Sequence, residues 1–220
     1  MKSASIGNSK IYQLYLQLCQ RYGRPRDFWQ KWCKRPKGKQ DKEEVVLGAV
    51  LTQRISWFNV EKALANLKAQ KALSIKGVYK IGKKNTGLLE ELIKPTGFYK
   101  QKAKKLFGLC RLIIEKHAGL DNFFKQDLSS CRQELLGVWG VGPETADDIL
   151  LYAGQKPIFV IDEYTRRFAK KHNLARDFSY HHLQQLFENS LPKSIKVFQD
   201  YHAMIVLQGR GTTWDLTTKL

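Results

Sequence analysis

Two features of this chain have residue types and spacing that suit chemistry: a solitary aspartate and a glycine-rich turn upstream of it. Asp162 ends an apolar run, residues 157–161, and comes just before a new helical pattern at Glu163. A carboxylate in a low-dielectric pocket can stabilise a developing positive charge and orient or deprotonate a water molecule. Asp162 also suits the N-cap of the helix that begins near Glu163, and the two roles can coexist.

The glycine-rich turn, Gly140-Val141-Gly142, lies between two helical patterns, which predicts a helix, a tight hairpin and a second helix. Glycine can adopt positive φ and lets another chain come close. Pro143 suits the first turn of the second helix, where its missing N–H costs nothing. Amide N–H groups at such a helix start attract an anion, above all a phosphate. We therefore expect Gly140, Val141, Gly142 and Thr145 to contact a phosphate backbone.

The charge of the chain indicates a polyanionic partner. Its 220 residues include 38 Lys and Arg against 20 Asp and Glu, for a formal net charge of +18 and a pI of about 9.8. Nucleic acid is favoured over a membrane, because no basic amphipathic anchor stands out. A basic surface that only maintains solubility is the alternative. No apolar segment is long enough to span a membrane, and none resembles a signal core. We expect a cytoplasmic protein, nucleoid-associated if prokaryotic, with reduced thiols.

Helical periodicity without long alternating β-branched runs predicts an all-α fold. A hydrophobic content of 43% suits a globular core. Residues 34–39 form a basic linker rich in Pro and Gly, which places a domain edge near residue 40. The nearly uncharged run 47–53 predicts a buried helix that ends near Gln53. The clearest helical patterns cover residues 11–19, 41–53, 57–67, 88–93, 121–137, 164–172, 183–191 and 194–208.

The Gly-Val-Gly-x-x-Thr-Ala motif, followed by the apolar run that ends in Asp162, resembles the helix-hairpin-helix DNA glycosylases of the endonuclease III superfamily. The resemblance covers residues 41–210. It implies a two-lobed helix-hairpin-helix glycosylase fold with a central cleft. Residues 41–154 would form a helical barrel lobe that ends in the hairpin, and residues 1–40 with 155–220 would form the second lobe. It implies a monomer that acts on double-stranded DNA containing a damaged base.

The resemblance also assigns roles to residues of this chain. Asp162 matches the catalytic aspartate, which would stabilise the sugar cation as the base leaves. Gln53 lies where the superfamily inserts a polar wedge into the duplex, and its alternative role is capping a helix end. The run Gly97-Phe98-Tyr99-Lys100-Gln101-Lys102-Ala103 is similar to a family segment that enters a helix. Gly97, Lys100 and Lys102 would contact the DNA backbone, although such lysines often only solvate a helix face.

Glu144 departs from the strand-cutting members of the family. Those enzymes carry a lysine here, whose amine attacks C1′ and forms a Schiff base. A carboxylate cannot do this, so the sequence predicts a monofunctional glycosylase that uses water. Glu144 would help shape the base pocket or act as an ordinary first-turn acid. A lyase that uses another lysine, such as Lys156, is the alternative.

The expected cofactors also differ from those of endonuclease III. That enzyme binds a [4Fe–4S] cluster through four closely spaced cysteines near its end. Here the four cysteines are scattered, at Cys19, Cys33, Cys110 and Cys131, so no cluster is expected. In this superfamily the hairpin carbonyls can hold a monovalent cation against a DNA phosphate. The matching carbonyls here belong to Leu136, Val138 and Val141.

Aromatic residues point to the class of damaged base. Phe28, Trp29 and Trp57 are candidates for stacking on a flipped base, although Trp57 and Trp29 also suit a core. Electron-rich rings favour a cationic partner such as 3-methyladenine. The runs Leu-Gly-Ala-Val-Leu-Thr-Gln and Gly-x-Gly-x-Glu-x-Ala-Asp resemble the 3-methyladenine DNA glycosylase III branch. That branch has a lysine near the C-terminus that can be carbamylated, but the matching residue here is Met204. The alternatives are glycosylases for mismatched thymine or oxidised bases, and a non-catalytic helix-hairpin-helix DNA-binding protein.

Overall fold

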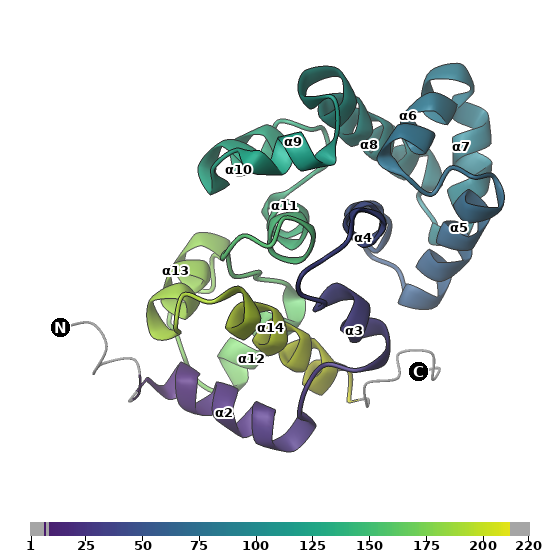
Figure 1. The fold of residues 1–220 in the computed structure, drawn as a ribbon. Coiled ribbons are helices and arrows are strands. Elements are labelled where there is room, and N and C mark those ends of the chain that lie inside the picture. Colours follow the sequence, from purple (N-terminus) through teal and green to yellow (C-terminus); the bar gives the residue numbers. More distant parts are fainter. Residues whose placement is uncertain (1–6, 8, 212–220) are drawn as a thin grey trace. The chain divides into compact units, whose positions relative to one another are not determined.

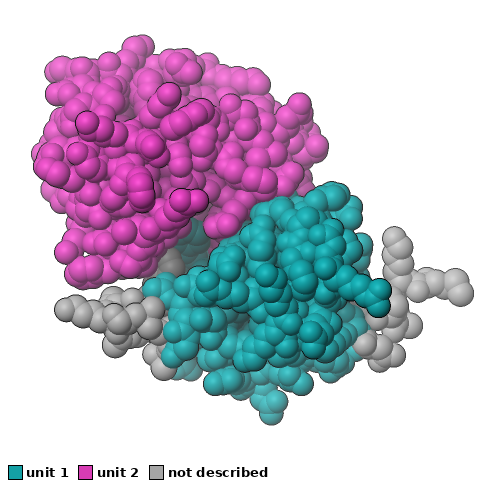
Figure 2. All heavy atoms as spheres, turned by 180° about the vertical axis from the view of Figure 1, so that it is seen from behind, with its two compact units in different colours: residues 1–35, 155–220 teal, residues 36–154 magenta. Residues whose placement is uncertain are grey.

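The computed structural model describes residue 7 and residues 9–211, with the side chains of residues 27 and 28 left out. Its ordered elements are helices, and residues 9–211 contain no strand, which confirms the predicted all-α fold (Figure 1). No helix within this range is both long and apolar enough to cross a membrane. The chain forms two compact units, residues 1–35 with 155–220 (unit 1) and residues 36–154 (unit 2), which Figure 2 colours separately.

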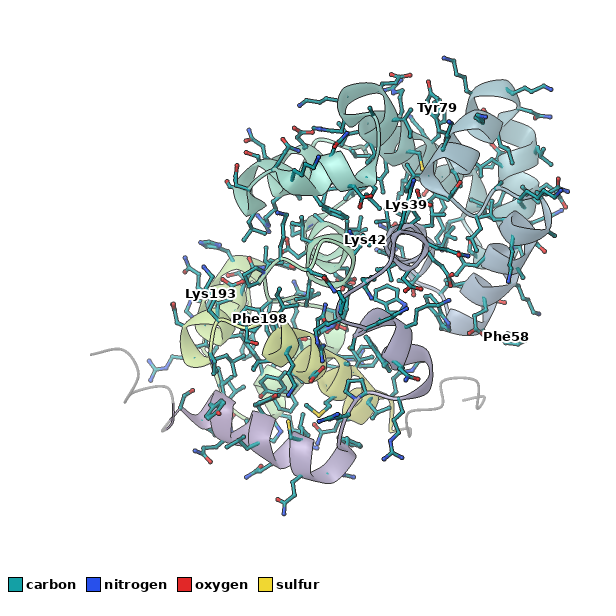
Figure 3. All side chains as sticks on the ribbon, viewed as in Figure 1. Lys39, Lys42, Phe58, Tyr79, Lys193 and Phe198 are labelled. Carbon is teal, nitrogen blue, oxygen red and sulfur yellow. The ribbon has the colours of Figure 1, made fainter. Side chains whose placement is uncertain are left out.

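Unit 1 joins the two ends of the sequence in one core. The Tyr201 hydroxyl donates a hydrogen bond of 3.0 Å to the carbonyl of Ile11, a residue 190 positions earlier. Phe198 is buried on the same C-terminal helix and meets Phe159 edge-on, with ring centroids 5.5 Å apart (Figure 3). The helices of unit 1 are α2 (Lys10–Tyr22), α3 (Asp27–Trp32), α12 (Glu163–Lys171), α13 (Tyr180–Ser190) and α14 (Ile195–Arg210).

The apolar run that leads to Asp162 is mostly buried, yet it belongs to no helix or sheet. Its backbone polar groups therefore need other partners, because a buried unpaired N–H or C=O is costly. Two side chains of α13 supply them. Glu188 accepts a hydrogen bond of 2.8 Å from the Phe159 N–H, and Gln184 donates one of 2.7 Å to the Phe159 carbonyl. The segment before Asp162 is thus fixed by α13.

Unit 2 is built around α4, which matches the prediction of a buried helix. Every residue from Val45 to Leu51 is buried, and α4 packs against α5, α8 and the π-helical turn η3. Unit 2 contains α4 (Lys39–Leu51), α5 (Trp57–Ala69), α6 (Ile75–Lys84), α7 (Thr86–Ile93), η1 (Lys94–Thr96), α8 (Tyr99–Arg111), η2 (Leu112–Lys116), α9 (Leu120–Lys125), α10 (Leu128–Leu136), α11 (Pro143–Asp148) and η3 (Ile149–Ala153).

The helix-hairpin-helix consists of α10, the turn at residues 137–142 and α11 (Figure 1). Gly140 has φ +79°, and a Cβ there would lie 2.4 Å from the Lys105 side chain, so both the turn and the close approach require glycine. Gly142 is extended instead and caps α11. Arg132 on α10 holds the fully buried Asp147 on α11 through contacts of 2.7 and 3.1 Å. Such a two-point ion pair fixes the angle between the two arms.

Candidate functional site

Asp162 lies at the N-cap of α12, as its alternative role predicted. Its Oδ1 accepts a hydrogen bond of 2.7 Å from the Thr165 N–H. Its Oδ2 lies 3.5 Å from Nε2 of His202, a residue of α14, and the Asp162 side chain is 14% exposed. Capping therefore uses one carboxylate oxygen, while the other faces an imidazole.

The pKa of Asp162 lies below its ordinary value despite the surroundings. Burial alone raises the pKa of this carboxyl, but the neighbouring His202 and the hydrogen bonds from Thr165 outweigh burial. Asp162 is consequently a carboxylate at neutral pH, which is the form that can stabilise a cation.

Trp29 belongs to the same cluster in unit 1. Its indole meets the His202 ring edge-on, with centroids 6.2 Å apart, and it also contacts Trp32 at 6.2 Å. Trp29 is buried, as its core alternative predicted. The side chain of Phe28 lies outside the described part of the structure. Met204, at the position of the family's modified lysine, is fully buried.

A second group of predicted site residues surrounds a cavity in unit 2. The cavity has a volume of ≈ 490 Å³ and lies beside the hairpin. Its charged lining is mostly basic, which suits an anion. The residues that line it are Gln53, Arg54, Phe98, Gln101, Lys102, Lys105, Gly142, Glu144 and Thr145.

Gln53, the predicted wedge, connects α8 to the hairpin. Its Oε1 accepts a hydrogen bond of 2.6 Å from Lys105 Nζ. Its Nε2 donates to the Thr145 hydroxyl at 2.9 Å and to the Gly140 carbonyl at 3.3 Å. Burial, together with the nearby Arg54 charge, lowers the pKa of Lys105. A wedge role for Gln53, which stays a prediction, requires its amide to leave these partners.

Lys102 was predicted to contact the DNA backbone, and the structure contradicts this. The side chain is only 2% exposed. Its Nζ donates hydrogen bonds of 2.8 Å to the carbonyls of Leu51 and Thr96. The ammonium therefore ties the end of α4 to the turn before α8. Burial, aided by the charge of Lys105, lowers the pKa of Lys102 to about 8.

Four cavity residues, Arg54, Phe98, Gln101 and Lys105, were not predicted as site residues. Phe98 is 66% exposed and has φ +46°, and Arg54 is exposed with φ +57°. Non-glycine residues in this left-handed region cost energy and often mark functional sites. Gly97 also has positive φ, with no atom within 4 Å of a Cβ placed there. Lys100 is exposed on α8. The glycine followed by an aromatic residue, Gly97-Phe98, was the sequence feature that could have indicated Phe98.

Glu144 and Trp57 differ in their surroundings. Glu144 is exposed in the first turn of α11 and lines the cavity, and its role in a base pocket stays a prediction. Trp57 is buried at the start of α5 and does not line this cavity, which agrees with its core alternative. A stacking role for Trp57 stays a prediction.

A monovalent cation at the hairpin carbonyls stays a prediction. The Val138 carbonyl accepts one hydrogen bond, of 3.0 Å, from the Val141 N–H, which leaves a second lone pair. Leu136, Val138 and Val141 would hold a monovalent ion by carbonyl oxygens. Within residues 9–211, no three His, Cys, Asp or Glu side chains are grouped so that they could hold a metal ion.

Comparison with known proteins places this geometry in a family. The description "HhH-GPD superfamily base excision DNA repair protein" matches residues 47–193. The chain belongs to this family. The matched range contains the last residues of α4, the hairpin and Asp162.

Relatives of this family member are similar over most of the chain. MJ1434 of Methanocaldococcus jannaschii, assigned by name to the DNA repair glycosylases, is 39% identical over 89% of this chain and 85% of its own length. The H. pylori 3-methyladenine DNA glycosylase MagIII, solved with 1,N6-ethenoadenine, has a TM-score of 0.73 and 27% identity, and the match covers 91% of this chain and 98% of MagIII. A DNA complex of endonuclease III matches in fold, with a TM-score of 0.71 and 21% identity over 91% and 85% of the two chains.

The buried Lys102 makes a testable contribution to the pH dependence of stability. Its pKa falls from 10.5 in the unfolded chain to about 8 in the folded protein. Between these values the unfolded state binds more protons, so the Lys102 contribution to the unfolding free energy increases with pH. We expect wild type to gain on the order of 2 kcal/mol over Lys102→Met between pH 8 and 10. Urea unfolding at several pH values measures this.

Lys100→Met is the matched control for that experiment. Lys100 lies two positions away on α8 and is exposed. Its variant should follow the pH dependence of wild type. A Lys102→Met curve parallel to wild type would contradict a buried, proton-releasing ammonium.

Proposed function

We propose that this protein is a monofunctional DNA glycosylase that removes an alkylated purine, such as 3-methyladenine, from double-stranded DNA. The observation that carries the proposal is a carboxylate held in its charged form at Asp162. A carboxylate at residue 144, where the strand-cutting relatives have an amine, argues against a covalent mechanism. The likeness to MagIII supports the choice of an alkylated base.

The proposed reaction uses water as the nucleophile. As the base departs, deoxyribose develops oxocarbenium character and positive charge near C1′. Asp162 stabilises this charge electrostatically and orients or deprotonates the attacking water. An alkylated purine such as 3-methyladenine already carries positive charge and leaves without strong acid assistance. One carboxylate is then sufficient for catalysis.

DNA binding in the proposal combines the hairpin with the cavity beside it. The hairpin amides and a net charge of +18 attract the phosphate backbone. Phe98 and Gln53 line the cavity next to the hairpin, where they would contact bases around a flipped nucleotide. We propose that exposed Phe98 stacks on a base, because an apolar ring in a strained conformation gains by covering a π-face.

Replacing Asp162 tests the catalytic part of the proposal. Asp162→Asn keeps an N-cap, because asparagine caps helices as well as aspartate does, but it removes the negative charge. We expect the single-turnover release of 3-methyladenine from methylated duplex DNA to fall by about 100-fold or more, with duplex affinity retained. A panel that includes a T·G mismatch and an oxidised base identifies the preferred lesion.

Asp127→Asn is the matched control for Asp162→Asn. Asp127 caps α10 by accepting a hydrogen bond of 2.9 Å from the Ser130 N–H, which is the same local role. The Asp127→Asn variant should release the base at the wild-type rate. If Asp162→Asn behaves like Asp127→Asn, Asp162 is only a cap. If wild type releases no base from the whole panel, the protein is a DNA-binding module.

The monofunctional mechanism predicts the result of borohydride trapping. Wild-type protein should give no covalent adduct with lesion-containing DNA, because no amine is positioned to attack C1′. Glu144→Lys should gain a trapped adduct, since it places an amine at the edge of the cavity. An adduct with wild type would contradict the proposal, and its loss in Lys156→Ala would identify the lysine responsible.

Phe98 has its own test. Phe98→Ala should weaken binding to a lesion-containing duplex several-fold, consistent with about 1–3 kcal/mol per stacked base. The control is Phe58→Ala. Phe58 is 50% exposed in the same unit and extends from α5, where Lys62 contacts its ring (Figure 3). Fluorescence titration with duplex DNA measures both variants, and equal effects would remove Phe98 from the proposed interface.

A further inference from the structure

His202 is a buried titratable residue for which the proposed function has no role so far. It lies on α14, and the side chains of His202 and Asp162 are 5% and 14% exposed. Its Nε2 lies 3.5 Å from Asp162 Oδ2. The edges of the ring meet two aromatic side chains, Trp29 at 6.2 Å and Phe159 at 6.5 Å between centroids. The imidazole is thus enclosed by apolar rings and directed at one carboxylate.

The two oxygens of Asp162 have separate partners. The Thr165 N–H holds Oδ1 at 2.7 Å, and the imidazole faces Oδ2. The carboxylate thus lies between two elements, with α12 bonded to one oxygen and α14 facing the other. With the cap alone, the carboxylate could still turn about its Cβ–Cγ bond. The imidazole on α14 is placed to limit that rotation.

Neighbouring charges are engaged elsewhere. Asp200, two residues before His202 on α14, pairs with Arg35 at 3.0 Å. Arg166 on α12 directs its guanidinium to the Ile161 carbonyl at 3.5 Å. The rings of Trp29 and Phe159 that pack on the imidazole carry no charge. His202 is therefore the basic side chain that faces Asp162.

We propose that His202 is a positioning residue for catalysis: its imidazole N–H holds Oδ2, keeps Asp162 ionised and aims the carboxylate at the sugar. The inference rests on the proposed role of Asp162. A neutral Nε2–H tautomer suffices, because it donates a hydrogen bond without cancelling the negative charge that the sugar cation needs. Loss of the donor would leave a partly buried carboxylate, which protonates more readily.

The pH profile of excision tests this role. His202→Phe removes the donor, and the acid limb of the single-turnover rate on methylated duplex DNA should move to higher pH by about one unit or more. His202→Gln keeps an N–H donor, so it should restore most of the rate at pH 7.5 and shift the limb less. The affinity for duplex DNA should not change in either variant. A wild-type acid limb in folded His202→Phe would show that His202 only packs.

His117→Phe is the matched control. His117 pairs with Glu134 in unit 2 at 2.6 Å and is also largely buried. Its replacement should lower thermal stability and leave the acid limb in place. An equal shift in this variant would overturn the inference, because the shift would then follow from any lost histidine–carboxylate pair.

A readout that does not use activity separates this inference from the proposed function. The ring ¹⁵N chemical shifts of His202 should change in Asp162→Asn, since its partner oxygen becomes an amide group. Unchanged ¹⁵N shifts would contradict the contact between His202 and Asp162, even if His202→Phe failed to fold. If Asp162→Asn excises normally, the proposed function fails, and the ¹⁵N shifts still decide the contact. If Asp162→Asn is inactive and the acid limb does not move in His202→Phe, only the positioning role fails.

Discussion

The central interaction of unit 1 is the contact of Thr165 and His202 with the carboxylate of Asp162, which is mostly shielded from water. An isolated buried charge is expensive, and a carboxyl in that position would normally take up a proton. Asp162 escapes this because a helix start and an imidazole each engage one of its oxygens. The preceding residues also help to place Asp162. Side chains of α13 hydrogen-bond the N–H and the carbonyl of Phe159 and so hold the run that leads to it. The helix cap and the carboxylate proposed to act in catalysis are thus the same side chain.

Unit 2 solves the converse problem with a buried cation. Lys102 lies in the interior, where two carbonyls replace its hydration and the low-dielectric surroundings oppose its charge. The result is a rigid connection between α4 and the turn before α8. Gln53 comes directly after α4, and Phe98 directly before α8, so this connection controls both ends of the cavity. A lysine that seems exposed by its basic sequence context therefore organises residues proposed to touch DNA.

Some of the fold and the site could be predicted from the sequence for local reasons. The uncharged run at 47–51 could only be a buried helix, and Gly140 marks a turn that needs positive φ and close approach. Asp162 could be singled out because it ends an apolar run downstream of the glycine-rich turn, and both features are visible in the sequence. Lys102 was assigned wrongly because a basic helix face looks the same whether one lysine points outward or inward. Which one turns inward depends in part on the carbonyl of Leu51, which is 51 positions earlier in the sequence.

The proposed role of His202 could not be predicted from the sequence, because it depends on a contact between two helices. A histidine amid apolar residues on a helix suits a core, and nothing in its own segment indicates a carboxylate partner forty residues earlier. The same segment explains why the family's modified lysine has no counterpart. Met204, at that position, is fully buried among apolar side chains, where a charged group would need a partner. In this chain the residue of α14 that faces Asp162 is His202. The electrostatics of the site thus follow from which face of α14 turns toward α12.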